Sequence, residues 1–139
     1  MNYKKTRVIV CAIIEKNNSL LFGRKKEKMG PYPNAWHLLG GGVHDGESLN
    51  DAIKREIKEE SGIEVEITKS LGFDEDSEPS KNGETTHYIF LAFLAKYVSG
   101  EIKADDDIKR LAWIEKEELA KIELTKPSLR LFKEIGYLN

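Results

Sequence analysis

GGVHDGESLNDAIKREIKEESGI, residues 41–63, is the segment of the chain with the clearest signals of local structure. It predicts a helix over Leu49–Ser61. Ser48 is a good N-cap residue, and Asp51 three positions later resembles a capping box. Gly62 occupies the position where a left-handed C-terminal cap belongs. Local sequence therefore sets both ends of the helix.

The charges around this helix are unusual for a helix that only packs on a core. On a wheel of about 100° per residue, one arc holds four apolar residues that must face the core: Leu49, Ala52, Ile53 and Ile57. Three polar residues fall on the opposite side, facing water: Asp51, Lys54 and Lys58. Glu56 and Glu60 fall inside the apolar arc, and Glu59 falls at its edge.

Carboxylates in that arc need compensation for burial. An ionised carboxylate that is buried alone costs several kcal/mol, and acids at these helical spacings repel one another. A divalent cation that prefers hard oxygen ligands, Mg²⁺ or Mn²⁺, would resolve both problems. An acidic helix rim paired with Lys and Arg explains the same pattern, and the wheel alone does not separate the two interpretations.

The segments on either side of this helix predict a sheet and two further helices. Five runs are expected strands: residues 7–14, 20–22, 65–73, 85–98 and 111–114. Turns or loops are expected at 16–19, at 30–34 and in the acidic segment 74–83. A short helix is expected over 115–122 and a C-terminal helix over 127–135. This order of elements indicates one domain over residues 1–139, an α/β or α+β sandwich.

The composition is typical of a soluble globular protein. The chain has 139 residues, of which 40% are hydrophobic and 33% charged, and its net charge is −2. This balance argues against binding to nucleic-acid polymers, which requires a basic surface. The single cysteine excludes an internal disulfide, and the apolar run at 8–14 is too short to span a bilayer. We therefore expect a cytoplasmic protein with neither a nucleic-acid nor a membrane partner.

Charge is unevenly distributed along the chain. Residues 1–28 carry eight Lys or Arg and two acids, whereas residues 41–84 carry thirteen acids and five Lys or Arg. An acidic middle segment facing a basic N-terminal hairpin suits a metal bound beside a phosphate. Two ordinary solvated surfaces explain the same distribution.

The segment 41–63 resembles the Nudix box. Gly41 is followed by five residues and Glu47, then by seven residues and the run Arg55-Glu56-Ile57-Lys58-Glu59-Glu60-Ser61-Gly62-Ile63, so that every fixed position of the box matches. Trp36 before the box, and Trp113-Ile114 with Glu117-Glu118-Leu119 after it, resemble the rest of small MutT-like Nudix hydrolases. The resemblance implies a Nudix-type α/β/α sandwich with the box helix packed on a mixed sheet.

The same resemblance implies an activity. We expect a metal-dependent pyrophosphohydrolase that cleaves a nucleoside diphosphate linked to another moiety, for example a (deoxy)nucleoside triphosphate or a nucleotide sugar, by water attack on phosphorus. The expected partner is this small-molecule nucleotide, and the expected cofactor is Mg²⁺ or Mn²⁺. A non-catalytic nucleotide-binding sensor of the same fold is the alternative, although such modules usually lose box acids that are present here. A monomer and a homodimer are both compatible with the sequence.

The resemblance also implies roles for single residues. The expected metal ligands are three carboxylates and one backbone carbonyl, those of Glu56, Glu59, Glu60 and Gly40. Glu56 or Glu59 also orients or deprotonates the attacking water. Arg55 is expected to assist catalysis by holding Glu56 or Glu47 through charge-assisted hydrogen bonds, and Glu47 to support the loop.

The glycines of the box are expected to shape the loop beside the metal. Gly41, Gly42 and Gly46 are expected to let the backbone turn sharply there. Gly41 and Gly42 are also expected to contact the substrate.

Further candidates lie outside the box. Asp107, six residues before Trp113, is the expected additional metal ligand, with a plain acidic loop as the alternative. Arg24, which is followed by two lysines, is the expected phosphate contact, with a solvated strand end as the alternative. Three aromatic residues either stack on a base or fill the core: Phe73, Tyr88 and Phe90. No catalytic role is expected for the three histidines.

Overall fold

The computed structural model describes residues 3–25, 35–79, 83–105 and 108–139. Its elements in chain order are β1 Tyr3–Lys16, β2 Ser19–Lys25, β3 Leu39–Gly42, α1 Leu49–Ser61, β4 Glu64–Pro79, β5 Thr85–Ser99, β6 Ile108–Glu115, the 3₁₀ helix η1 Lys116–Lys121 and α2 Lys126–Glu134. Across these ranges, neither α-helix has the length and apolar character needed to cross a membrane.

The strands form one mixed sheet, as expected. The strand order is β4-β5-β1-β2-β6, and β3 pairs with β1 beside this path. β1 and β5 run parallel, and every other pair is antiparallel. The expected hairpin between β1 and β2 is present, with Asn17 at φ 57 in its turn. The apolar strand β1 therefore lies at the centre of the sheet.

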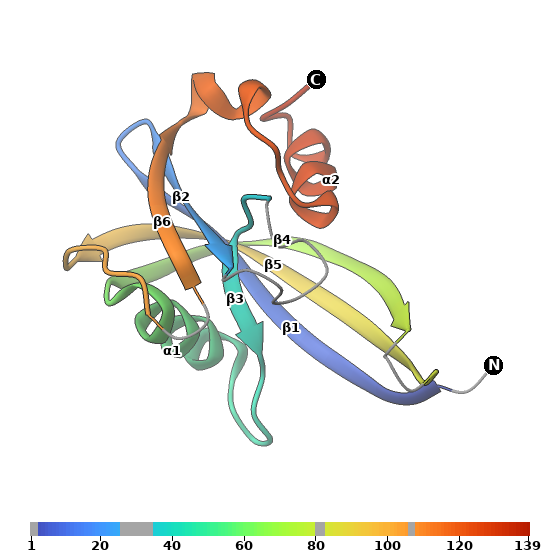
Figure 1. Cartoon of the computed structure of the whole chain (residues 1–139). Coiled ribbons are helices and arrows are strands. Elements are labelled where there is room, and N and C mark those ends of the chain that lie inside the picture. Colours follow the sequence, from blue (N-terminus) through green and yellow to red (C-terminus); the bar gives the residue numbers. More distant parts are fainter. Residues whose placement is uncertain (1–2, 26–34, 80–82, 106–107) are drawn as a thin grey trace.

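Helices cover both faces of this sheet, with α1 below it and α2 above it in Figure 1. Alternate side chains of β1 supply the two cores, because successive strand residues point to opposite faces. Val10, Ala12 and Ile14 pack with buried residues of α1, whereas Ile13 packs with Phe132 of α2. The expected α/β/α arrangement is confirmed.

The caps of α1 confirm its predicted ends. The Ser48 hydroxyl accepts a hydrogen bond from the Asp51 backbone N–H at 3.1 Å. Gly62 adopts φ 79, and its N–H donates to the Lys58 carbonyl at 2.9 Å. One expectation for this helix is wrong: the Leu49 side chain is 38% exposed, because it lies in the first turn, at the end of the buried stripe.

The acidic segment 74–83 is not the turn expected from its sequence. Residues 74–79 belong to β4, which pairs with β5 as far as Pro79 opposite Thr85. Backbone pairing with the long apolar β5 overrides the low strand propensity of Asp and Glu. The strand tolerates these acids because alternate side chains of β4 stay exposed to water. Residues 80–82 and the expected loop at 30–34 lie outside the described residues.

The other elements differ from expectation mainly in length. β1, β2 and β6 extend beyond the runs expected over 7–14, 20–22 and 111–114, because paired polar residues continue each strand. The expected short helix at 115–122 is the 3₁₀ helix η1. The expected C-terminal helix matches α2 to within one residue at each end.

Replacing Ser48 by alanine removes the side-chain cap of α1. We expect Ser48→Ala to lower the free energy of unfolding by about 1 kcal/mol, the typical value for a lost N-cap. Urea unfolding should show a lower midpoint and an unchanged slope. Ser99→Ala, at the exposed end of β5, is the control and should leave the midpoint unchanged.

Candidate functional site

Close approach of other groups explains two glycines of β3. A Cβ atom at Gly40 would lie 1.9 Å from the Val10 carbonyl oxygen, inside the backbone of β1. A Cβ atom at Gly41 would lie 2.4 Å from the Glu56 carboxylate. Only glycine lets β3 pair with β1 while the Glu56 side chain packs directly against the strand.

The prediction of a sharp backbone turn at Gly41 and Gly42 is wrong. Both residues lie in β3 and pair with Val10 and Ile9, since the requirement for glycine comes from side-chain space and not from the backbone angle. At Gly42, a Cβ would lie 2.7 Å from the Arg7 guanidinium. The turn occurs further on, at Gly46, where φ is 78.

The Arg55 side chain ties α1 to the segment before it. Its Nε and Nη2 donate to the two carboxylate oxygens of Glu47 at 2.7 and 2.9 Å. Nη2 also donates to the Gly42 carbonyl at 2.9 Å, and Nη1 donates to Glu56 at 2.8 Å and approaches Glu59 at 3.4 Å. Arg55 thus contacts both of its expected partners, Glu47 and Glu56, together with the backbone of β3.

This network shifts the ionisation of its members. The hydrogen bond from Arg55, followed by one from the His44 backbone N–H, lowers the pKa of Glu47 to about 2. The hydrogen bonds to Glu47 and then to Glu56 raise the pKa of the Arg55 guanidinium above its usual value. Both members of the pair are therefore charged at neutral pH.

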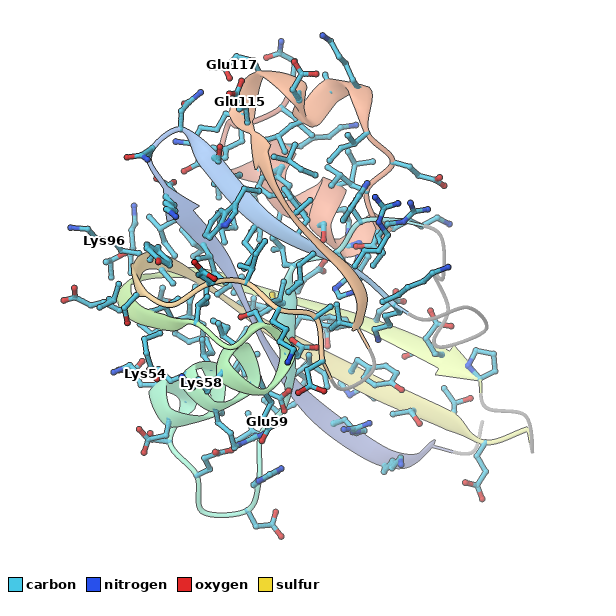
Figure 2. All side chains as sticks on the ribbon, turned by 60° about the vertical axis from the view of Figure 1, so that its left-hand side comes forward. Lys54, Lys58, Glu59, Lys96, Glu115 and Glu117 are labelled. Carbon is cyan, nitrogen blue, oxygen red and sulfur yellow. The ribbon has the colours of Figure 1, made fainter. Side chains whose placement is uncertain are left out.

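The three acids expected at the metal have different surroundings. Glu60 is 4% exposed, and its carboxylate accepts a hydrogen bond from the Gly40 N–H at 2.9 Å. The Glu56 side chain is 12% exposed, whereas the Glu59 side chain is 48% exposed and lies beside Arg55. Figure 2 shows the two lysines expected to face water on the outer surface of α1, Lys54 and Lys58. The wheel thus placed Glu56, Glu59 and Glu60 correctly around the helix.

These acids supply the chemistry that a hard divalent cation requires. Among the described residues, no three carboxylate, imidazole or thiol groups are close enough together to hold a metal ion. Glu56 and Glu60 nevertheless line one cavity beside β3. The donor set fits Mg²⁺ or Mn²⁺ through these two carboxylates, and Glu59 would join them by leaving Arg55.

A cavity of about 810 Å³ lies beside this cluster, on the α2 face of the sheet. Alternate residues of three neighbouring strands form its floor: Arg7, Ile9 and Cys11 of β1, Tyr88, Phe90 and Ala92 of β5, and Asp76 and Glu78 of β4. Gly40, Gly41, Gly42, Glu56 and Glu60 bound one side. Burial raises the pKa of the Cys11 thiol to about 12, so this thiol is protonated at neutral pH.

Two charged residues are expected to contribute to the site from outside the box, Arg24 and Asp107. The Arg24 guanidinium lies 5.3 Å from the centre of the Trp36 ring and does not line the cavity, whereas Lys25 does. Asp107 lies outside the described residues. The Asp105 N–H donates to the Glu60 carbonyl, which places Asp105 beside α1.

The three aromatic candidates lie in two different environments. Tyr88 and Phe90 are neither core residues nor isolated, because their rings stack at 6.0 Å between centroids and line the cavity. Phe73 is 74% exposed and contributes to neither the core nor the cavity.

Sequence reasoning missed several cavity residues, chiefly Arg7, Asp76 and Glu78. Each lies on a strand whose alternate side chains face the cavity. The period-two spacing of the acids at 74, 76 and 78 was the available signal. With Tyr88 and Phe90, these residues give the cavity a guanidinium, two carboxylates and an aromatic pair. The aromatic pair suits a planar ring, and the guanidinium suits an anionic group.

Comparisons with known proteins agree with this geometry. The family profile of the NUDIX domain matches residues 4–135. Nucleoside triphosphatase NudI from Enterobacter sp. (strain 638) is 30% identical over 140 residues, covering 96% of this chain and 99% of the relative. The crystal structure of a MutT NUDIX hydrolase from Burkholderia pseudomallei is 28% identical, with a TM-score of 0.79, and covers 94% of this chain and 98% of its own. The MutT protein from Methanosarcina mazei Go1, at 24% identity and a TM-score of 0.79 over 96% of this chain and 94% of its own, shares the fold.

Replacing each glycine of β3 by alanine should lower the free energy of unfolding by a different amount. Gly40→Ala inserts a methyl group into the β1 backbone and should destabilise most, since overpacking typically costs about 1–3 kcal/mol. Gly41→Ala should cost less because the Glu56 side chain has to move, and Gly42→Ala should cost least because only the tip of Arg7 moves. Urea unfolding of the three variants gives the order. An equal cost for Gly40→Ala and Gly42→Ala would contradict the close-approach explanation.

The low pKa of Glu47 predicts a pH-dependent contribution to stability. A depressed folded-state pKa stabilises the protein above the unfolded value of 4.5, and this contribution is lost as the pH falls toward about 2. Wild type should therefore exceed Glu47→Gln in unfolding free energy by more at pH 6 than at pH 3. Urea unfolding of both proteins at the two pH values measures the difference, and a difference that does not change with pH would be inconsistent with this role.

Proposed function

The chain belongs to the NUDIX domain family of hydrolases, which act on phosphoric anhydride bonds, and we propose that it is a metal-dependent pyrophosphohydrolase of nucleoside triphosphates. The observation that carries this proposal is that two acids of α1, Glu56 and Glu60, line a cavity large enough for a nucleotide together with the glycines of β3. The name of the NudI relatives, nucleoside triphosphatase, supports the choice of substrate. Nudix hydrolases generally use divalent metal ions.

Mg²⁺ is the proposed cofactor, with Mn²⁺ as a substitute. Glu56 and Glu60 would hold it together with Glu59 and the Gly40 carbonyl, and Asp107 is proposed as a further ligand. When bound, the metal neutralises phosphate oxygens and lowers the pKa of a water molecule.

The side chains of the protein position the reacting groups. Arg55 holds the Glu56 carboxylate against Gly41, at the edge of the cavity. Glu56 or Glu59 orients the attacking water and accepts its proton, as a carboxylate within reach can do. Gly41 and Gly42 let the phosphates approach the β3 backbone closely. We assign phosphate binding to the cavity cations Arg7 and Lys25 in place of Arg24.

The alternative of a non-catalytic sensor is less well supported. The box acids are all present, and two of them face the cavity. An enzyme of this kind works where nucleoside triphosphates accumulate, so we propose the cytoplasm as its location.

The test is hydrolysis of nucleoside triphosphates to monophosphate and pyrophosphate in Mg²⁺. We expect turnover that EDTA abolishes and Mg²⁺ restores, and we expect Glu56→Gln and Glu59→Gln to lower kcat by about 100-fold or more, since they remove metal-binding charge.

Glu64→Gln is the matched control, because its carboxylate pairs with Lys58 on the surface at 3.1 Å. It should leave turnover unchanged. Mg²⁺ should also raise the melting temperature of wild type more than that of Glu56→Gln, since a ligand of the folded state stabilises it. Full turnover in EDTA would exclude the metal role, and tight nucleotide binding without turnover in either metal would favour the sensor.

A further inference from the structure

The proposed hydrolysis uses one side of the cavity, and a distinct set of residues lies on the other side. There the stacked rings of Tyr88 and Phe90 form an aromatic surface on β5. Asp76 of the neighbouring strand β4 lies directly opposite Tyr88, and Glu78 follows on the same face of β4. A planar group packed against this aromatic pair would therefore lie beside two carboxylates.

Within the part of the chain that the structure describes, these two carboxylates are available to a ligand. The third acid on this face of β4, Asp74, is paired with Arg130 of α2 at 2.7 Å. Within the described residues, neither Asp76 nor Glu78 has a cationic side chain within 4.0 Å. One Asp76 oxygen accepts the Ser77 backbone N–H at 2.8 Å, which fixes the carboxylate and leaves its second oxygen available.

The charges of the cavity allow a nucleotide to bind in one direction. Arg7 of β1 lies opposite Tyr88 on the side away from β4, and its guanidinium reaches Gly42 of β3. β3 and β4 are separated by three strand spacings, or about 14 Å. Phosphates are attracted to Arg7 and the metal side, and are repelled by Asp76 and Glu78. The base is thereby directed onto the aromatic pair, with its edge toward β4.

We infer that Asp76 and Glu78 are specificity-determining residues that select a nucleobase bearing an amino group. An ionised carboxylate only accepts hydrogen bonds, and an exocyclic amino group donates them, as in the contact of Asp or Glu with cytosine N4. Uracil and thymine place a carbonyl oxygen where cytosine has its amino group, so two acceptors would face each other. The substrate class is nucleoside triphosphates of cytosine, adenine or guanine. This inference rests on the proposed function for the orientation of the nucleotide.

CTP and UTP form a pair of probes that differ on one edge of the base: CTP has an amino group at C4, whereas UTP has a carbonyl oxygen at C4 and a proton on N3. With the full chain in Mg²⁺, we expect kcat/KM to favour CTP by at least about tenfold, because a site built around a substrate N–H rejects the analogue that lacks it. Asp76→Asn and Glu78→Gln keep the shape but supply a donor to the carbonyl, so the CTP/UTP ratio should fall toward one. Each ratio compares two substrates on one preparation, so partial unfolding of a variant does not change it.

Glu75→Gln is the control. Glu75 is adjacent to Asp76 but points to the opposite face of β4, where its carboxylate lies 2.8 Å from the His87 ring. This variant should keep the wild-type ratio. A wild-type ratio near one, or a ratio that neither Asp76→Asn nor Glu78→Gln changes, would overturn the inference.

Calorimetric binding of CMP and UMP separates this inference from the proposed function. If neither triphosphate is hydrolysed but CMP binds at least tenfold more tightly than UMP, and the two β4 variants lose that preference, the hydrolase proposal fails and the selectivity stands. If both triphosphates are hydrolysed equally well, the selectivity fails and the hydrolase proposal stands. Absence of hydrolysis together with equal binding of CMP and UMP would overturn both.

Discussion

The rest of the site depends on the guanidinium of Arg55. It holds the loop through Glu47, the strand β3 through the Gly42 carbonyl, and the acids of its own helix through Glu56 and Glu59. Without this cation, three carboxylates in one small region would repel one another. Charge-assisted hydrogen bonds to several acceptors therefore make the helix, the loop and the glycine strand a single rigid unit.

The glycine strand connects the two faces of the sheet. α1 packs on one face, where Val10 and Ala12 of β1 are buried, while the cavity lies on the other face, above Ile9 and Cys11. Side chains on β3 would block the carboxylates of α1 from the cavity. Because three of the four residues of β3 are glycine, carboxylates of α1 line a cavity that lies on the opposite face of the sheet.

Local signals account for what the sequence predicted well. The caps at Ser48 and Gly62 defined α1, and helical periodicity placed Glu56 and Glu60 toward the interior. What was missed depends on pairing between distant segments. The acidic end of β4 continues as a strand only because it pairs with β5. Whether Arg24 or Lys25 faces the cavity depends on the register of β2, since a shift of one residue reverses the face to which a side chain points. The cavity floor combines three strands whose alignment no single segment encodes.

The position of β4 at the edge of the sheet has a consequence for the protein in a crowded solution. An edge strand exposes unpaired backbone groups that can recruit another chain, and β4 is long and carries the exposed Phe73. Its repeated acids counter this tendency, because like charges oppose the approach of a second copy. The residues that we assign to base selection thus also guard against aggregation. Under that assignment, a change of base preference through these acids would also change the charge along the edge strand, and would therefore couple substrate choice to self-association.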